Sequence, residues 1–221
     1  MKSLTSIPSL CTPVHLARGS RLYVVAGRPT ILVERFDQAP VPGGGTRRFY
    51  LSAHTLLGLD ESGLDRRIWS YLELAHLLRR ISDEPEGDVI ELFRRMVFNA
   101  LVTNLDDHPR NHAVIGTAAG GWRLSPAFDL VASNAASTDN RELAMICGAL
   151  PGRERWASRA NLVSGCQHFG LIPDAAASII DEIKAVVTAS WHAELGAQGG
   201  TDQDCRNVAY AIAYEGFELD P

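Results

Sequence analysis

Residues 104–129 read NLDDHPRNHAVIGTAAGGWRLSPAFD, a stretch in which a polar loop is followed by two short apolar runs and a further acid. Asp106 and Asn111 stand five positions apart in the loop. The apolar runs AVI and WRL flank a glycine-bearing turn, which predicts a small β-hairpin. Because a hairpin returns the chain to its starting point, we expect Asp129 to come back to the loop.

This set of side chains suits phosphoryl transfer. The oxygens of a phosphoryl group repel an incoming hydroxyl until a cation neutralises their charge. Mg²⁺ prefers oxygen ligands, which carboxylates and an amide can supply. Another carboxylate can orient and deprotonate the acceptor hydroxyl. An Asp, an Asn five positions on and a later Asp are typical of the centre of protein-kinase-like phosphotransferases.

Composition and charge limit the class of protein. A chain of 221 residues with 46% hydrophobic and 21% charged residues is ordinary for one globular domain, or one and a half. The net charge of −5 argues against a general nucleic-acid binder or a protein of anionic membrane surfaces. Four scattered cysteines without a C-x-x-C pair fit a reduced, cytoplasmic compartment. We find neither a signal-peptide core nor the ~18 apolar residues of a membrane span.

The N-terminal part has the pattern of β-strands. Residues 22–25 and 30–36 are rich in β-prone side chains and are separated by the turn-forming sequence AGRP. They predict a hairpin. Residues 47–51 are expected to form a further strand or an extended connection.

The strongest helix is expected from Asp88 to about Val102, leading directly into the polar loop. Asp88 and Glu91 resemble a capping box at its start. The polar face of this helix, with Glu91, Arg94 and Arg95, is expected to meet solvent.

Helical periodicity also marks four other segments. Pro173 is expected in the first turn of one of them, where proline is favoured. Thr201 with Asp204 can cap the last one. The four segments span residues 65–80, 156–169, 174–195 and 205–214. The sequence therefore predicts an α+β protein that is mainly helical.

Four short segments, in this order, carry a resemblance to a known family. They read ERFD at 34–37, ELFRRMVFNALVTN at 91–104, DDHPRN at 106–111 and LSPAFD at 124–129. With them the chain resembles the C-terminal part of HipA-type serine/threonine kinases, which are toxins of bacterial toxin–antitoxin modules. The resemblance covers most of the chain.

The resemblance implies a protein-kinase-like C-lobe with a small N-terminal β-hairpin and hinge. Residues 1–38 would be residual strands and hinge of the N-lobe, and residues 39–221 the helical lobe. The rest of the N-lobe, with its phosphate-covering loop and strand lysine, is largely missing, because Lys2 has no strand–glycine-loop context. The resemblance thus implies an ATP:protein phosphotransferase that works if that lobe is supplied.

ATP and Mg²⁺ are the cofactors that the resemblance implies. Asp106 would be the catalytic base, and Asn111 and Asp129 would hold the metal.

The resemblance also implies a set of residues on the nucleotide side. Glu34 and Phe36 would lie at the hinge that receives the adenine, and Asp37 would contact the nucleotide. His108 belongs to this set as a residue that supports the loop.

Partners follow from the resemblance as well. It implies a protein substrate of the aminoacyl-tRNA synthetase class and a DNA-binding antitoxin. A partner chain could bring the N-lobe. An exposed apolar face on the hairpin would otherwise make the chain sticky or homodimeric.

Two alternatives stay open. The lobe could be a binding or regulatory remnant that docks a partner without chemistry. A metal-dependent hydrolase could instead use His108 and His112 with the aspartates, although Pro109 between them disfavours a helical His pair. We otherwise expect His112 to have no special role, and the plain alternative for Asp106 and Asp107 is that both are ordinary loop acids.

Overall fold

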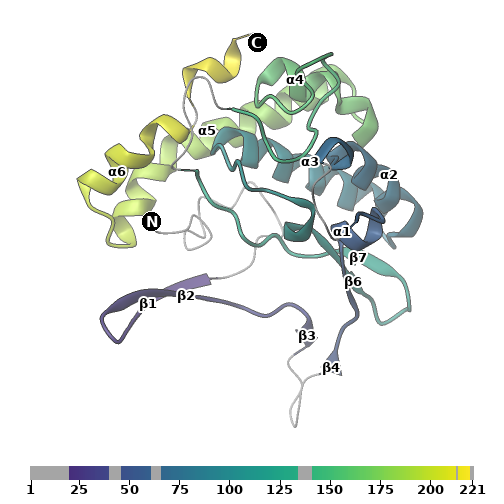
Figure 1. Cartoon of the computed structure of the whole chain (residues 1–221), viewed down its shortest axis with the longest axis horizontal. Helices are drawn as coiled ribbons and strands as arrows, with labels where there is room; N and C mark the ends of the chain where they lie inside the picture. Colours follow the sequence, from purple (N-terminus) through teal and green to yellow (C-terminus); the bar gives the residue numbers. More distant parts are fainter. Residues whose placement is uncertain (1–19, 40–45, 61–65, 134–140, 213, 220–221) are drawn as a thin grey trace.

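The computed structural model describes residues 20–39, 46–60, 66–133, 141–212 and 214–219. Figure 1 shows a helical body with a β-arm that projects from one side of it. The arm is the hairpin of β1 (Ser20–Val25) and β2 (Arg28–Val33), as the sequence predicted. The fold is α+β and mainly helical, with the N-terminal hairpin that was expected. Lys2 lies outside the described residues.

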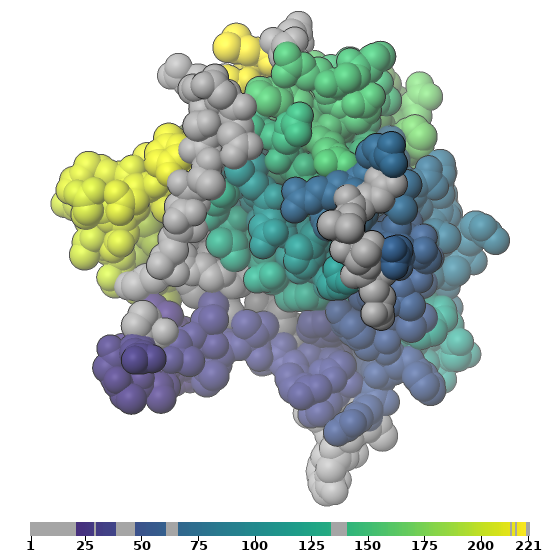
Figure 2. Space-filling model, in the orientation of Figure 1, coloured from purple at the N-terminus to yellow at the C-terminus, as the bar shows by residue number. Residues whose placement is uncertain are grey.

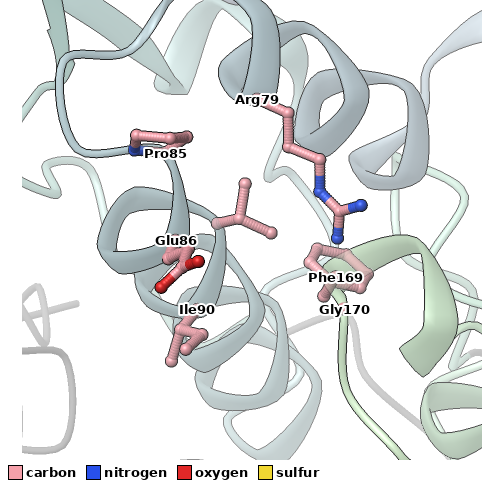
Figure 3. A pocket seen from close by; sticks show the side chains of 7 residues that line it. Arg79, Pro85, Glu86, Ile90, Phe169 and Gly170 are labelled. Atoms are coloured by element: carbon pink, nitrogen blue, oxygen red, sulfur yellow. The ribbon is translucent and has the colours of Figure 1, made fainter.

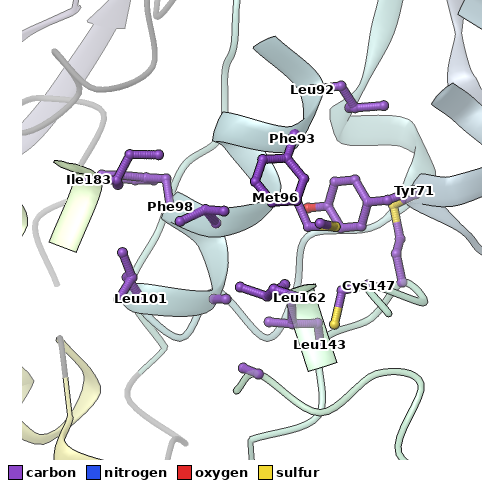
Figure 4. Packing of buried hydrophobic residues seen from close by; sticks show 14 of the residues in the cluster. Tyr71, Leu92, Phe93, Met96, Phe98, Leu101, Leu143, Cys147, Leu162 and Ile183 are labelled. Carbon is purple, nitrogen blue, oxygen red and sulfur yellow. The ribbon is translucent and has the colours of Figure 1, made fainter. Parts of the chain in front are cut away.

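The centre of the body is α3 (Pro85–Leu101). It packs against α2 (Tyr71–Ile81) and against α5 (Pro173–Ala197). Apolar side chains from several elements surround it, as Figure 4 shows. Among the largest buried side chains of α3 are Leu92, Phe93, Met96 and Phe98. A helix buried on nearly every side gives the following loop a rigid starting point.

The predicted start of α3 was wrong. The helix begins at Pro85, whose fixed φ suits a first turn, and no side chain caps it. Asp88 is fully buried, and its carboxyl accepts from the backbone N–H of Leu124 at 2.8 Å and from the Ser82 hydroxyl at 2.6 Å. It also pairs with Arg123 at 3.0 Å. The Asp88 carboxyl, which its sequence position assigned to a helix cap, therefore bonds a strand that is distant in the sequence.

The predicted solvent face of α3 was also wrong. Glu91, Arg94 and Arg95 are all buried. Arg95 bonds Glu91 at 2.9 Å, and Arg94 makes a bidentate pair with Glu182 at 2.7 and 3.0 Å. Buried charges of this kind persist where they are paired and hydrogen-bonded. From Glu91 onward, the surrounding helices and strands cover the whole circumference that periodicity had divided into two faces.

A three-stranded antiparallel sheet lies next to α2 and α3, in the order β5–β6–β7. The hairpin of β6 (Ala113–Gly116) and β7 (Trp122–Leu124) is confirmed. The third strand, β5 (Tyr50–Ser52), pairs with β6. It lies slightly later in the sequence than the strand predicted at 47–51. Two shorter strands, β3 (Gln38–Ala39) and β4 (Thr46–Arg47), pair with each other.

Local signals set the ends of most other helices. α2 begins at Tyr71, later than predicted, because Ser70 accepts from two backbone N–H groups of its first turn. Pro173 begins α5, as predicted. The capping box of Thr201 and Asp204 is confirmed, although α6 (Asp202–Val208) is shorter than expected.

The predicted helix over 156–169 is broken into α4 (Arg159–Ser164) and the 3₁₀ turn η4 (Cys166–Phe169). The remaining short elements are α1 (Ala53–Leu56), η2 (Arg66–Ile68), η3 (Pro109–Asn111), η5 (Ala209–Ala211) and η6 (Glu215–Glu218). Over the described ranges, every helix is too short or too polar to cross a membrane.

Candidate functional site

The polar loop joins the end of α3 to the start of β6. Asp106 is exposed, whereas its neighbour Asp107 is only 1% exposed. Thr103, just before the loop, has a φ of +50°, which turns the chain away from the helix axis. One acid of the Asp-Asp pair therefore faces solvent and the other lies in the interior, so the alternative that both are ordinary loop acids does not hold for Asp107.

A buried polar network holds the loop from beneath. The Tyr71 hydroxyl donates to Asp107 Oδ2, and Nε2 of His112 lies 2.9 Å from the same oxygen. Asn99 of α3 donates to the Tyr71 hydroxyl at 3.0 Å, and Asn104 donates to Asn99 at 3.1 Å. His112, expected to have no special role, is part of this network. Nothing in the local sequence ties these five residues together, since their partners come from two helices and the loop.

Asn111 lies beside Asp106 at the top of the loop. Its side-chain N–H donates to the backbone carbonyl of Asp106 at 3.3 Å. With the amide nitrogen used in this way, the amide oxygen remains to accept or to bind a cation. Asn111 is 7% exposed, so most of its surface is covered.

Asp129 is exposed and has a φ of +57°. Its segment is bonded to both ends of the polar loop. The backbone N–H of Ser125 donates to Ala113 at 2.8 Å, and that of Ser133 donates to Thr103 at 3.1 Å. The return of the chain predicted from the hairpin therefore occurs, because the two segments run side by side. A left-handed φ in a residue other than glycine is uncommon and often accompanies function.

Arg95 also positions the Asp129 segment from below. Its Nη2 donates to the Ser125 carbonyl at 2.7 Å, while Nε bonds Glu91. Burial lowers the pKa of the Arg95 guanidinium, and the neighbouring carboxyl of Glu91 opposes that shift. Arg95 thus connects the central helix to the strand end that precedes Asp129.

A cavity of about 590 Å³ lies between the hinge and this segment. Its walls include Glu34, Phe36, Asp37 and Asp129, four residues that the sequence had assigned to one site. The Phe36 ring lies 5.5 Å from the Phe128 ring and 6.2 Å from the Tyr50 ring, measured between centroids. Phe128 and Tyr50 were missed by sequence reasoning, although Phe128 directly precedes Asp129. The cavity combines aromatic walls with carboxyl groups at its rim.

Asp37 is paired within this wall. Arg35 donates to it from Nε at 2.9 Å and from Nη2, and this hydrogen bonding lowers the pKa of the Asp37 carboxyl. Asp106, Asn111 and His108 are not among the residues that line the cavity. The structure thus brings Asp129 to the hinge cavity, and the backbone bonds of Ser125 and Ser133 attach its segment to the two ends of the polar loop.

His108 faces a different neighbour. Its ring meets the Trp69 ring edge-on at 6.4 Å, and its buried Nδ1 has no hydrogen-bond partner among the described residues. His112 turns instead to Asp107. The Asp/His cluster required by the hydrolase alternative is therefore not assembled, and the described ranges hold no group of three or more His, Cys, Asp or Glu suited to a metal ion.

These features define a kinase-like C-lobe, in which a helical body carries a polar loop and a small sheet that returns an acid to it. The chain belongs to the family of HipA-like C-terminal domains, whose family model matches residues 14–191.

Y4mE of Sinorhizobium fredii, whose name proposes a kinase, is 28% identical over 130 residues, covering 55% of this chain and 30% of Y4mE. A chain from the complex of Shewanella oneidensis MR-1 HipA, HipB and operator DNA matches 95% of this chain with a TM-score of 0.73 and 21% identity. The match covers 52% of that chain, so the present chain spans about half its length. The Helicobacter pylori proinflammatory kinase CtkA is a looser neighbour, with a TM-score of 0.44, 13% identity and coverage of 86% and 82%, and supports no inference here.

Proposed function

We propose that the chain is the C-terminal lobe of a HipA-like serine/threonine kinase that transfers the γ-phosphate of ATP to a protein hydroxyl. The observation that carries this proposal is the cavity shared by the hinge residues and Asp129. Phe36, Phe128 and Tyr50 offer aromatic surfaces for a flat base, and the volume of about 590 Å³ is typical of nucleotide-sized pockets.

The oxygens of Asn111 and Asp129 fit the requirements of Mg²⁺. Both side chains present an oxygen, and among the described residues the Asp129 carboxyl forms no ion pair. Bound Mg²⁺ would neutralise the phosphate oxygens. Asp106, exposed on the same loop as Asn111, would orient the acceptor hydroxyl and take its proton. His108 would keep the loop in place through Trp69, and Glu34 and Asp37 would contact the nucleotide from the rim.

The hairpin supports a second part of the proposal, that an N-lobe packs on this chain. One face of the hairpin carries Leu22, Val24, Ile31 and Val33, and Val24 is 75% exposed. In Figure 2 the hairpin forms an arm below the helical body. A two-stranded hairpin alone is marginal in water, so a covering sheet would stabilise it. The N-lobe would complete the nucleotide site, whether it belongs to this protein or to a partner chain.

Further partners are proposed from the family. The HipA neighbour was solved together with HipB and operator DNA, which supports an antitoxin as a partner of this chain. The acceptor would be a serine or threonine of a protein, with the aminoacyl-tRNA synthetases as the first class to test. A homodimer through the hairpin is the expected state when no N-lobe covers it.

Calorimetry with ATP tests the nucleotide site. Binding should require Mg²⁺, and Asp129→Asn should weaken it, whereas Asp106→Asn should leave binding intact and abolish phosphate transfer. Asp202→Asn, at a surface helix far along the chain, is the control. If ATP does not bind either the chain alone or the chain with its N-lobe, the kinase proposal fails.

A binding module without chemistry is the second candidate, and the exposed apolar hairpin favours it. In that case a partner would be captured equally well by the wild type, Asp106→Asn and Asp129→Asn. Capture should be lost in Val24→Ser combined with Val33→Ser, since these changes remove the apolar face.

A further inference from the structure

Two histidines meet where α2 packs against η4, outside the site described above. His76 and His168 are 92 positions apart in the sequence, yet Nδ1 of His168 lies 3.1 Å from Nε2 of His76. Their ring centroids are 5.0 Å apart, and the ring planes differ by 28°. Both rings reach solvent. No role in phosphoryl transfer or in the buried network requires this pair.

The spacing of the two nitrogens matches that of two ligands on one metal ion. Zinc–imidazole bonds are about 2.0–2.1 Å long. Two nitrogens bound at a tetrahedral angle are therefore about 3.3 Å apart, and at a right angle about 2.9 Å. The observed 3.1 Å lies between these values. A cation that binds both nitrogens would therefore replace the hydrogen bond between the two rings.

We infer that His76 and His168 form a binding site for a borderline divalent cation of the Zn²⁺, Ni²⁺ or Cu²⁺ class. Imidazole nitrogen suits these ions, whereas Mg²⁺ prefers oxygen. The chain supplies two ligands, and water completes the coordination. Glu73 lies one helical turn before His76 on the same side of α2, and its negative charge favours a bound cation. Arg79 lies one turn after His76, and its positive charge opposes a bound cation.

The cation connects two elements that also form the walls of a second cavity. Arg79 of α2, with Phe169 and Gly170 at the end of η4, lines one side of a hollow of about 480 Å³, whose other wall is the first part of α3, as Figure 3 shows from close by. Each of these residues is within three positions of one of the two histidines. A metal bridge would therefore fix the separation of α2 and η4 on one side of this hollow.

Calorimetry and Cu²⁺ electron paramagnetic resonance on the full chain test the site. ZnCl₂ should bind with a stoichiometry of one and raise the melting temperature, and MgCl₂ without nucleotide should give neither effect at these histidines. His76→Asn and His168→Asn should each weaken Zn²⁺ binding about tenfold or more, since loss of even an outer-shell partner costs that much. His192→Asn, an exposed histidine on α5, is the matched control and should bind as the wild type does.

The spectrum of bound Cu²⁺ should report two imidazole nitrogens in the wild type and one in each single variant. Acidification should release the metal, because protons compete for the same nitrogens. An absence of saturable Zn²⁺ binding, or equal binding by the wild type and both variants, would overturn the inference. Neither result depends on ATP, so the outcome is separate from that of the kinase proposal.

Discussion

Asp107→Ala is expected to break the buried hydrogen-bond network beneath the polar loop and to lower the free energy of unfolding of the domain substantially. The substitution removes the acceptor of the Tyr71 hydroxyl and the partner of His112 Nε2 in a region that is almost completely buried. A hydrogen bond to a charged group contributes about 1.5–3 kcal/mol, and removing one member of a buried pair costs about 3–5 kcal/mol. We therefore expect a loss of about 3–5 kcal/mol, against a total of about 5–15 kcal/mol for a typical domain.

Urea unfolding followed by circular dichroism measures this loss as a fall in the midpoint at constant slope. The adjacent Asp106→Ala is the matched control, because it changes the same residue type in the same loop at an exposed position. It should alter stability by less than about 0.5 kcal/mol while removing the proposed base. Tyr71→Phe should also be destabilising, and its effect should not add to that of Asp107→Ala, because the two side chains share one bond.

A loss below about 1 kcal/mol for Asp107→Ala, with an unchanged slope, would refute this reasoning. It would mean that Tyr71 and His112 find water or other partners once the carboxyl is gone. Equal losses for Asp106→Ala and Asp107→Ala would contradict the opposite burial of the two acids.

Three other sets of substitutions test separate parts of the structure. Asp129→Gly should be more stable to urea than Asp129→Ala by about 1–2 kcal/mol, because the φ of +57° suits glycine, and equal stabilities would speak against that backbone conformation. Arg95→Met should cost about 3–5 kcal/mol, because it removes the guanidinium that pairs with the buried Glu91 carboxyl, and Glu91→Leu in the same chain should recover much of the loss; a double variant no better than the single one would contradict this. Burial raises the pKa of the Cys147 thiol from 9.0 to about 12, so the unfolded state loses this proton first and stability should fall as the pH rises from 9.0 toward 12. Cys147→Ala should reduce that fall, and native Cys147 should resist iodoacetamide at pH 9.0; rapid alkylation of the folded chain would count against a buried thiol.

Sequence patterns predicted the elements that depend on neighbours along the chain. The hairpin of β6 and β7, the start of α5 at Pro173 and the capping box of Thr201 with Asp204 are confirmed. In each case the deciding contacts lie within a few residues, so a short window contains the physical cause. The exposed apolar residues that were expected on the β1–β2 hairpin are also confirmed.

The candidate site was predicted in part. The hairpin correctly indicated that the segment containing Asp129 returns to the ends of the loop, and Glu34, Phe36 and Asp37 line one cavity with Asp129, whereas the roles assigned to these residues stay predictions. The network beneath the loop could not be predicted, because Tyr71 and Asn99 reach it from two different helices. The spacing of these residues along the chain does not indicate that their side chains are in contact.

The sequence by itself determined where this chain turns, where several helices begin, and which residue types stand ready for a metal and a nucleotide. The tertiary structure alone decided which charged residues are buried. Arg95 and Asp88 looked like a surface cation and a helix cap, yet both lie inside, bonded to residues from β7 and its continuation. The reason is that burial depends on which distant elements cover a side chain, and a buried charge is stable only where those elements also supply its partners.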